Sequence, residues 1–321
     1  MALLRIPGRF KFPVTQSEWR ALIGAFTGDS GSGGTLGLVP APATGDASAA
    51  KFLKADGTWA VPAGGGSSGH GQCFLAKSSS NLVLSPKNGN QLIINGTAQA
   101  VPDAGVSLST SGLSSSTLYY IYAYMNSGTM TLEASATAYA VSTTSGNKGI
   151  VIKSGADTRT LVGMARTNGS TAWVDSDSQR FVRSYFNEDG VSTKKSFTAS
   201  RNTTSTTFVE ANSEIRNEAL LWSGEKWHLA LGGGGYNSAA GNAVWIAFAL
   251  DGTTAESGAP YFNGAGVNYA NTLGGAICKT GLSEGYHYAT LLLAVSAGTG
   301  TLGGIAPFSA TITTLSGRTM K

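Results

Sequence analysis

The chain has 321 residues, of which 12% are charged and 44 are glycine, and its formal net charge is +4. Average soluble domains carry about 25% charged residues and about 7% glycine, so this composition favours short strands and tight turns over long helices. The basic residues form no run longer than Lys194-Lys195. Because nucleic-acid-binding proteins carry a clustered basic stripe, we expect no nucleic acid among the partners.

The sequence shows no export signal and no apolar run long enough for a membrane span. Arg5 and Pro7 interrupt the apolar N-terminal stretch, unlike the core of a signal peptide, and the longest apolar run is only Ala243 to Leu250. Cys73 and Cys278 lie far apart, so we expect two free thiols rather than a disulfide framework or a metal site. No cofactor is expected, and the protein is expected to be made in a cytoplasm without membrane insertion.

One short amphipathic helix is predicted near the N-terminus. Thr15-Gln16-Ser17-Glu18 fits a capping box, and Gly28 ends the pattern. Between them, large apolar residues recur at helical spacing, at Trp19, Leu22, Ile23 and Phe26. A helix of this length is unstable alone in water, so we expect its apolar face to dock either on a partner or on the β-domains of this chain.

Residues 31–70 have the composition of a linker, rich in glycine, serine and proline. Their glycines do not form a nucleotide-binding loop, because no strand precedes them and no helix with Lys-Ser/Thr follows. Within the linker, Lys51–Lys54 and Asp56–Trp59 predict one small hairpin with an Asp-Gly turn.

The segment from Gly37 to Pro62 reads GLVPAPATGDASAAKFLKADGTWAVP. It resembles the GLVPAP…GD…KFLKADGTWA…P linker of bacteriophage tail fibres and related virion appendages. The resemblance implies a structural virion protein, assembled in the host cytoplasm, whose residues 1–30 anchor it to another phage virion protein. It also implies a homotrimer, although the sequence shows no heptads that would specify an oligomer.

Residues 71–190 have the pattern of an all-β middle domain. Strands are predicted at 81–84, 91–94, 118–124, 129–133, 149–153, 160–166 and 180–186. The run SPKNGNQLIING…LYYIYAY…GIVIKSGADTRTLVGMARTNG…RFVRSYFN is similar to a β-domain of phage tail and other virion proteins. This second resemblance is independent of the linker.

Residues 191–321 have the pattern of a second β-domain. Strands are predicted at 206–210, 214–221, 226–231, 243–250, 286–296 and 309–315. The continuous apolar run Val244–Leu250 is typical of a strand covered on both faces, which favours a jelly-roll-like sandwich. Phage fibres commonly end in trimeric β-tips, so by analogy this domain is the candidate receptor-binding tip.

Catalytic chemistry has weak support in the sequence. His70, His228 and His287 have no partner at metal spacing, and His228 alternates with Trp227 and Leu229 as a solvent-facing strand residue would. A polysaccharide depolymerase would need paired carboxylates. The candidates for such a pair are Glu210, Glu214, Glu218, Glu225, Asp175 and Asp177, which fit scattered surface positions better.

Binding through aromatic side chains is the better-supported alternative. Tyr236, Tyr261 and Tyr269 lie in or beside Gly/Asn-rich segments, where loops on a rigid β-scaffold usually carry recognition, and they are the candidates for contact with a host surface glycan or protein. The same tyrosines could instead pack at a trimer interface. Trp222, Trp227 and Trp245 are expected in the core.

The sequence therefore favours a non-enzymatic phage tail fibre with two β-sandwich domains. A head fibre, collar or baseplate decoration that never touches a receptor is equally compatible with the same segments. A depolymerase spike is the third and least favoured alternative.

Overall fold

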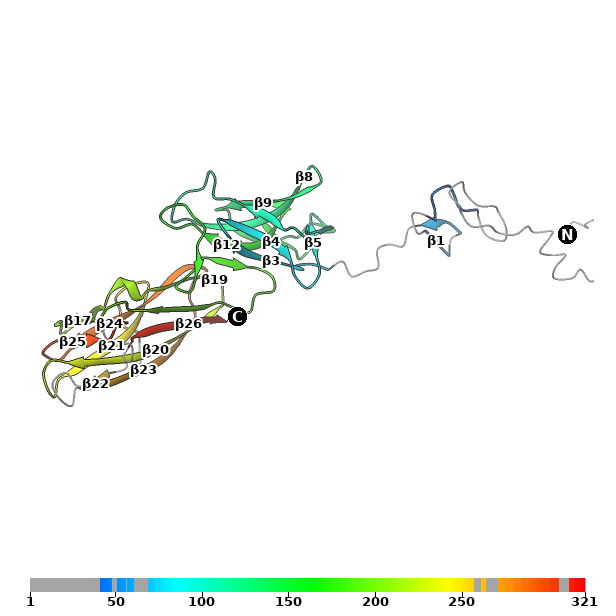
Figure 1. Cartoon of the computed structure of the whole chain (residues 1–321). Helices are drawn as coiled ribbons and strands as arrows, with labels where there is room; N and C mark the ends of the chain where they lie inside the picture. The colour runs from blue at the N-terminus through cyan, green and yellow to red at the C-terminus, as the bar shows by residue number, and fades with distance from the viewer. Residues whose placement is uncertain are drawn as a thin grey trace, which may run out of the picture. The chain divides into compact units, whose positions relative to one another are not determined.

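The computed structural model describes residues 41–47, 51–55, 57–60, 69–256, 261–263, 271–305 and 312–320, with the side chains of 261–263 and 273 excepted. The chain divides into two compact units, residues 1–68 and residues 69–321, and Figure 1 shows each of them. The predicted helix with Trp19, Leu22, Ile23 and Phe26 lies outside the described residues. Among the described residues, strands dominate and the helical structure is one 3-10 turn, η1 (Ser213–Ile215), so the all-β prediction is confirmed there. No helix in this part of the chain is long and apolar enough to cross a membrane.

The N-terminal unit contains the predicted hairpin. Strand β1 (Phe52–Leu53) pairs antiparallel with β2 (Trp59–Ala60), and Leu53 stands opposite Trp59. The backbone N–H of Lys54 donates to the carbonyl of Thr58 at 2.8 Å, and Gly57 adopts a positive φ of 81°. Glycine reaches this conformation without a steric cost, which explains why a Gly-containing turn closes the linker hairpin.

The middle lobe is built from three sheets around one core. A small sheet joins β3 (Cys73–Ser78), β4 (Asn81–Pro86) and β7 (Val106–Leu108), and β5 (Gln91–Ile94) pairs with β6 (Thr97–Ala100). The largest sheet contains β8 (Leu118–Asn126), β9 (Thr129–Ser135), β10 (Tyr139–Val141), β11 (Val151–Lys153), β12 (Ala156–Arg166) and β15 (Val182–Ser184). Alternate residues of these strands point inward and form a core that includes Leu75, Leu84, Ile121, Val162 and Trp173.

The C-terminal lobe is a β-sandwich. One sheet contains β13 (Asp175–Ser176), β14 (Gln179–Arg180), β18 (Val209–Glu210), β19 (Asn217–Leu221), β21 (Ala243–Leu250), β22 (Tyr261–Asn263) and β24 (Gly285–Val295). The other contains β16 (Ser192–Ser196), β17 (Arg201–Thr203), β20 (Lys226–Asn237), β23 (Asn271–Lys279), β25 (Gly300–Leu302) and β26 (Thr314–Met320). One buried cluster draws on both sheets, with Leu291 and Phe248 from the first and Trp227 and Leu315 from the second.

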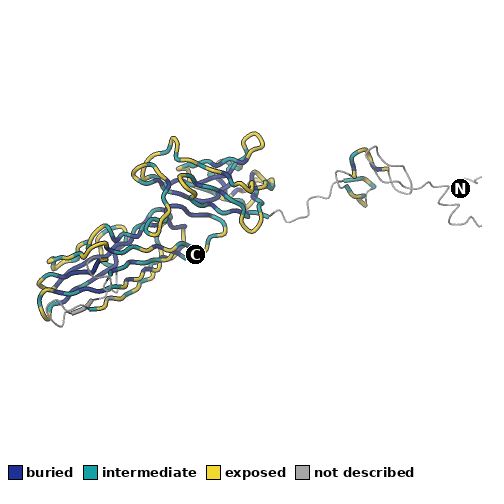
Figure 2. The backbone as a smooth tube through the Cα atoms, viewed as in Figure 1, coloured by how far each residue is buried: buried dark blue, intermediate teal, exposed yellow. Residues whose placement is uncertain are grey.

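Strand β21 is covered on both faces, as its apolar run predicts. Val244, Ile246 and Phe248 enter the core between the sheets, while Ala247 and Ala249 are buried on the outer face against Phe208 and Ala255. In contrast, β20 alternates strictly between buried and exposed residues over Lys226–Gly232. Figure 2 shows buried, intermediate and exposed residues mixed along the strands of the sandwich. Trp222 and Trp227 are buried as predicted, but Trp245 is only half-buried because its place in the alternation of β21 is on the outer face.

Several predicted strands have different limits in the structure, and three of them show the physical reason. The segment 180–186 breaks at Phe181, because β14 pairs with β19 of the C-terminal lobe whereas β15 pairs with β12 of the middle lobe. Within 214–221, the first residues form η1 and the strand begins at Asn217. The last strand runs from Thr314 to Met320, beyond the predicted end at 315, because it pairs with both β16 and β20 over that length.

Gly163 in β12 shows how closely the strands of the middle lobe pack. A Cβ atom at this position would lie 2.4 Å from the carbonyl oxygen of Arg183 and 2.5 Å from Cδ2 of Leu75. We expect Gly163→Ala to lower the free energy of unfolding by about 1–3 kcal/mol, since an extra methyl group must displace backbone. Urea unfolding measures this, with Gly169→Ala as the matched control because nothing lies within 4 Å of its Cβ position. Equal effects of the two substitutions would contradict the packing account.

Candidate functional site

The predicted receptor contacts are not brought together in the described residues. Tyr236 is half-buried in β20, opposite Thr301 of β25. The backbone of Tyr261 pairs with Trp245 at the edge of the other sheet. The side chain of Tyr261 and the whole of Tyr269 lie outside the described residues. The recognition role of these three tyrosines therefore stays a prediction.

The carboxylates considered for catalysis near η1 are held by arginine. Glu210 accepts two hydrogen bonds from Arg216, each at 2.7 Å, and this pairing lowers the pKa of Glu210. Glu214 accepts from the backbone N–H of Thr198 at 3.0 Å and from the guanidinium of Arg201. Although burial opposes its charge, these contacts lower the pKa of Glu214 below its ordinary value. Both groups are ionised partners of a fixed cation, an arrangement suited to holding loops in place.

The remaining candidate carboxylates also have polar partners. Glu218 accepts from Gln179 at 2.6 Å and from the hydroxyl of Tyr286. Asp175 and Asp177 share the guanidinium of Arg180, at 3.5 and 3.2 Å. Burial raises the pKa of Asp175 to about 6 despite this cation. Each of these carboxylates is therefore already engaged by a side chain of the same lobe.

Ser283, His287 and Asp251 form an arrangement with the residue types of a hydrolase triad. His287 is buried, its Nδ1 lies 2.6 Å from a carboxylate oxygen of Asp251, and its Nε2 lies 3.4 Å from Oγ of Ser283. The shorter contact of Nε2, however, is 2.8 Å to the carbonyl oxygen of Ser283. A carbonyl can only accept, so Nε2 carries a proton and cannot serve as the base for Oγ. The arrangement is a structural clamp between the turn after β21 and the start of β24.

This clamp gives the lobe a defined pH dependence. The hydrogen bond to Asp251 raises the pKa of His287 above 6.5, while the bonds from His287 and the N–H of Tyr288 outweigh burial and lower the pKa of Asp251 below 3.8. The stabilisation is therefore complete between about pH 4 and 6.5; it is lost as pH rises through the raised pKa of His287 or falls through the lowered pKa of Asp251.

We expect the difference in unfolding free energy between wild type and His287→Gln to be larger at pH 5.5 than at pH 9, by about 1 kcal/mol. Chemical unfolding at the two pH values measures it. A difference that does not change with pH would show that His287 is neutral in the fold.

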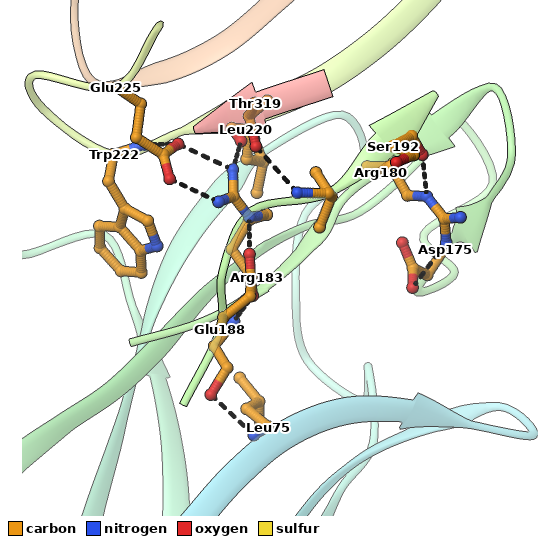
Figure 3. Close-up of polar contacts among 12 residues, drawn as sticks. Leu75, Asp175, Arg180, Arg183, Glu188, Ser192, Leu220, Trp222, Glu225 and Thr319 are labelled. Carbon is orange, nitrogen blue, oxygen red and sulfur yellow. Dashed lines mark hydrogen bonds and ion pairs between the residues drawn. The ribbon is translucent and has the colours of Figure 1, made fainter. Parts of the chain in front are cut away.

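The two lobes meet at a buried ionic group, the Arg183 cluster, formed by Arg183, Glu188, Glu225 and the carbonyl of Leu220 (Figure 3). The Arg183 side chain is 0% exposed. Its Nη1 and Nη2 donate to the two carboxylate oxygens of Glu225 at 3.0 and 2.7 Å, and it also bonds Glu188 and the carbonyl of Leu220. Burial raises the pKa of Glu188, although Arg183 and the N–H of Ser184 oppose this. Glu225 and Leu220 belong to the C-terminal lobe, so the cluster fastens one lobe to the other.

Tyrosines and a third carboxylate, Glu284, extend this junction. Glu284 accepts from the hydroxyls of Tyr120 and Tyr139 at 2.6 and 2.7 Å. Burial first, and then the contact with Glu284, raises the pKa of both tyrosines, so they remain donors. Tyr139 also lies edge-on to Trp222, with ring centroids 6.3 Å apart. These contacts join β8 and β10 of the middle lobe to the turn before β24.

Replacing the buried cation should be costly. In Arg183→Met, the carboxylates of Glu188 and Glu225 would be buried without a counter-charge, so we expect a loss of about 3–5 kcal/mol in unfolding free energy. Arg159→Met is the control, because its partner Glu133 is partly exposed and such pairs contribute about 1 kcal/mol or less. Urea unfolding compares the two variants. Adding Glu188→Gln and Glu225→Gln to Arg183→Met should recover part of the loss; no recovery would contradict the ionic account.

A groove of about 440 Å³ lies on the outward face of β20, β23 and β26. The register of the sheet places His228 opposite Cys278 on one side and Arg318 on the other. His228 is exposed, as its alternation predicts, and its Nε2 lies 3.3 Å from Sγ of Cys278. The groove is lined by His228, Leu229, Ala230, Ala276, Ile277, Cys278, Ser316, Gly317 and Arg318. This association was not predicted from the sequence, because 50 residues separate His228 from Cys278 and no strand was predicted at β23.

Both cysteines are free thiols, as expected; Cys73 is buried and Cys278 is exposed. His70, assigned to the linker from the sequence, has a defined place in the middle lobe. Its Nδ1 accepts from the N–H of Ile93 at 3.1 Å, and burial lowers its pKa. A neutral imidazole is needed for that acceptor role, so His70 helps to hold β5.

The described residues define an all-β protein in which the middle lobe is fastened to a two-sheet sandwich. No protein-family model matches the chain, and no curated protein matches it. Among solved structures, it is similar to "Structure of infectious bursal disease virus Gx strain", with a TM-score of 0.25 and 10% sequence identity, over 84% of this chain and 67% of that chain. A likeness of this size carries no argument about fold or function.

Proposed function

We propose that this chain is a structural virion protein, a phage tail fibre attached to the particle through residues 1–30 and touching the host cell surface with its C-terminal lobe. The observation that carries the proposal is the segment Gly37 to Pro62, whose sequence resembles the linker of phage fibres and whose Phe52–Ala60 portion folds into a hairpin. Such a segment connects an anchor to a distal domain without adding to either core.

The architecture of residues 69–321 supports a mechanical role. The Arg183 cluster and Glu284 fasten the middle lobe to the sandwich, and a fibre needs such stiff connections between its lobes. We also propose that the protein is not an enzyme. Retaining and inverting glycosidases need two carboxyl groups free to act on the sugar, and the candidate carboxylates here bond arginine, glutamine or tyrosine side chains instead.

The test uses particles of the phage whose genome encodes the chain. Mass spectrometry of purified particles should detect the protein, and an excess of the purified full chain should slow adsorption of particles to host cells. Absence from the particles would overturn the proposal. Presence without any effect on adsorption would favour the alternative, a head fibre, collar or baseplate decoration, over receptor binding.

We propose further that the working unit is a homotrimer, as the fibre resemblance implies. Native mass spectrometry and light scattering of the full chain should give three times the mass of one 32.8 kDa chain. A monomer at micromolar concentration would contradict this part of the proposal and leave the virion assignment to the particle experiment.

A further inference from the structure

The outward face around the groove is basic. We call it the basic groove and define it by the groove-lining residues together with Lys226, which precedes His228 on the same face of β20, and Lys194 of β16. Lys194 pairs in register with Ser316, and Lys226 pairs with Met320. Lys194, Lys226, His228 and Arg318 are all exposed. Three cations and the imidazole of His228 therefore lie on one face of three neighbouring strands.

The cations of this face lack partners, unlike the other arginines of the described residues. Ion pairs with carboxylates are formed by Arg159, Arg180, Arg183, Arg201 and Arg216. The guanidinium of Arg166 stacks on the ring of Tyr286, 4.2 Å from its centroid. Within that part of the chain, the structure shows neither kind of partner for Arg318, and no side-chain ion pair for Lys194 or Lys226. Two carboxylates close to these strands already have cations: Asp177, whose carbonyl accepts from the N–H of Lys194, is bound by Arg180, and Glu256 is bound by Lys279.

The floor of the groove limits what can bind there. Ala230, Ala276, Ser316 and Gly317 leave a shallow surface, and no Phe, Tyr or Trp lines the groove. Its one aromatic ring is the imidazole of His228, which lies 3.3 Å from Sγ of Cys278. Proteins that bind single-stranded nucleic acid stack the bases on aromatic side chains, which this floor does not offer. Lys194 and Lys226 stand opposite Ser316 and Met320, which lie two residues to either side of Arg318. With strands about 4.8 Å apart and a rise of about 3.4 Å per residue, the three cations lie on a diagonal about 8 Å apart, which suits an extended chain with repeated negative charges rather than one small anion.

We propose that the basic groove binds an anionic saccharide chain, one that carries carboxylate or phosphate groups along its length. Arg318 binds an anionic group from the groove itself, Lys226 and Lys194 bind the groups before and after it, and the small floor admits the sugar rings. This inference rests on the proposed function, for which it names the class of host surface ligand.

Cys278 provides a built-in reporter for the test. Its exposed thiol lies in the groove, whereas Cys73 is buried and serves as the internal control. The full chain is treated with N-ethylmaleimide alone or with polygalacturonate, a teichoic acid, neutral dextran or single-stranded DNA, and alkylation of each cysteine is followed by mass spectrometry. Polygalacturonate or teichoic acid should protect Cys278, and the two arms distinguish carboxylate from phosphate. Dextran should not protect it, and 0.5 M NaCl should remove the protection, because salt screens such contacts.

Variants link the protection to the named residues. Arg318→Gln and Lys226→Gln should each weaken polyanion binding about 10-fold, the equivalent of one charge-assisted contact. Ala276→Glu, at an exposed position of the floor, should abolish binding. Lys148→Gln is the matched control, since it removes one exposed lysine from the middle lobe and should leave binding unchanged.

Three results would overturn the inference: no protection by either anionic saccharide, equal binding by wild type and Arg318→Gln, or DNA that binds in the groove more tightly than both saccharides. These results are separate from the particle experiment. A chain that is present in particles and competes for adsorption, but whose Cys278 no polyanion protects, keeps the proposed function and loses the basic groove. A chain absent from particles loses the proposed function whatever it binds.

Discussion

The guanidinium of Arg183 is the contact on which the arrangement of residues 69–321 most depends. A fully buried charge is tolerated only when counter-charges and hydrogen-bond acceptors surround it, and here two carboxylates and a backbone carbonyl do so. The acceptors come from both sides of the junction, Glu188 from the middle lobe and Glu225 with Leu220 from the sandwich. Moving one lobe away from the other would break the contacts of Arg183 with Glu225 and with the carbonyl of Leu220. The cluster therefore stabilises the observed arrangement of the lobes, and any other arrangement loses these ionic contacts.

The path of the backbone reinforces this constraint. Just before Arg183, the chain leaves the sheet of the sandwich at Arg180 and enters the sheet of the middle lobe at Val182. Further on, the N–H of Val191 donates to the hydroxyl of Thr319, next to the start of β16. Gly190 permits this approach, since its φ is 100° and a Cβ atom would lie 1.9 Å from the carbonyl oxygen of Thr319. Two passages of the chain between the lobes and one buried cation therefore hold the same junction.

Local patterns in the sequence predicted the parts of the fold that are set by residues adjacent in the chain. The apolar run of β21, the alternation of His228 with buried neighbours and the Asp-Gly hairpin each follow from a few adjacent residues. The break at Phe181 could not be predicted this way, because each half of that segment pairs with a strand from a different lobe. The same limit applies to the candidate site: Arg318 and Cys278 flank His228 only after three distant strands align. Tyr236, Tyr261 and Tyr269 were predicted as receptor contacts from the composition of their segments, and no strand pairing entered that prediction.

One end of the sandwich is fastened to the middle lobe through Glu225, and the opposite end lies away from this junction. Strand β20 begins next to Glu225 and ends at Asn237, about 35–40 Å further on for a strand of its length. There, Asn237 bonds the carbonyl of Ala297, and Ser238 bonds the carbonyl of Thr299, so the two turns brace each other. Substitutions in these turns would alter the far surface while leaving the buried charges untouched. The far end of the sandwich can therefore change in shape and charge without weakening the junction.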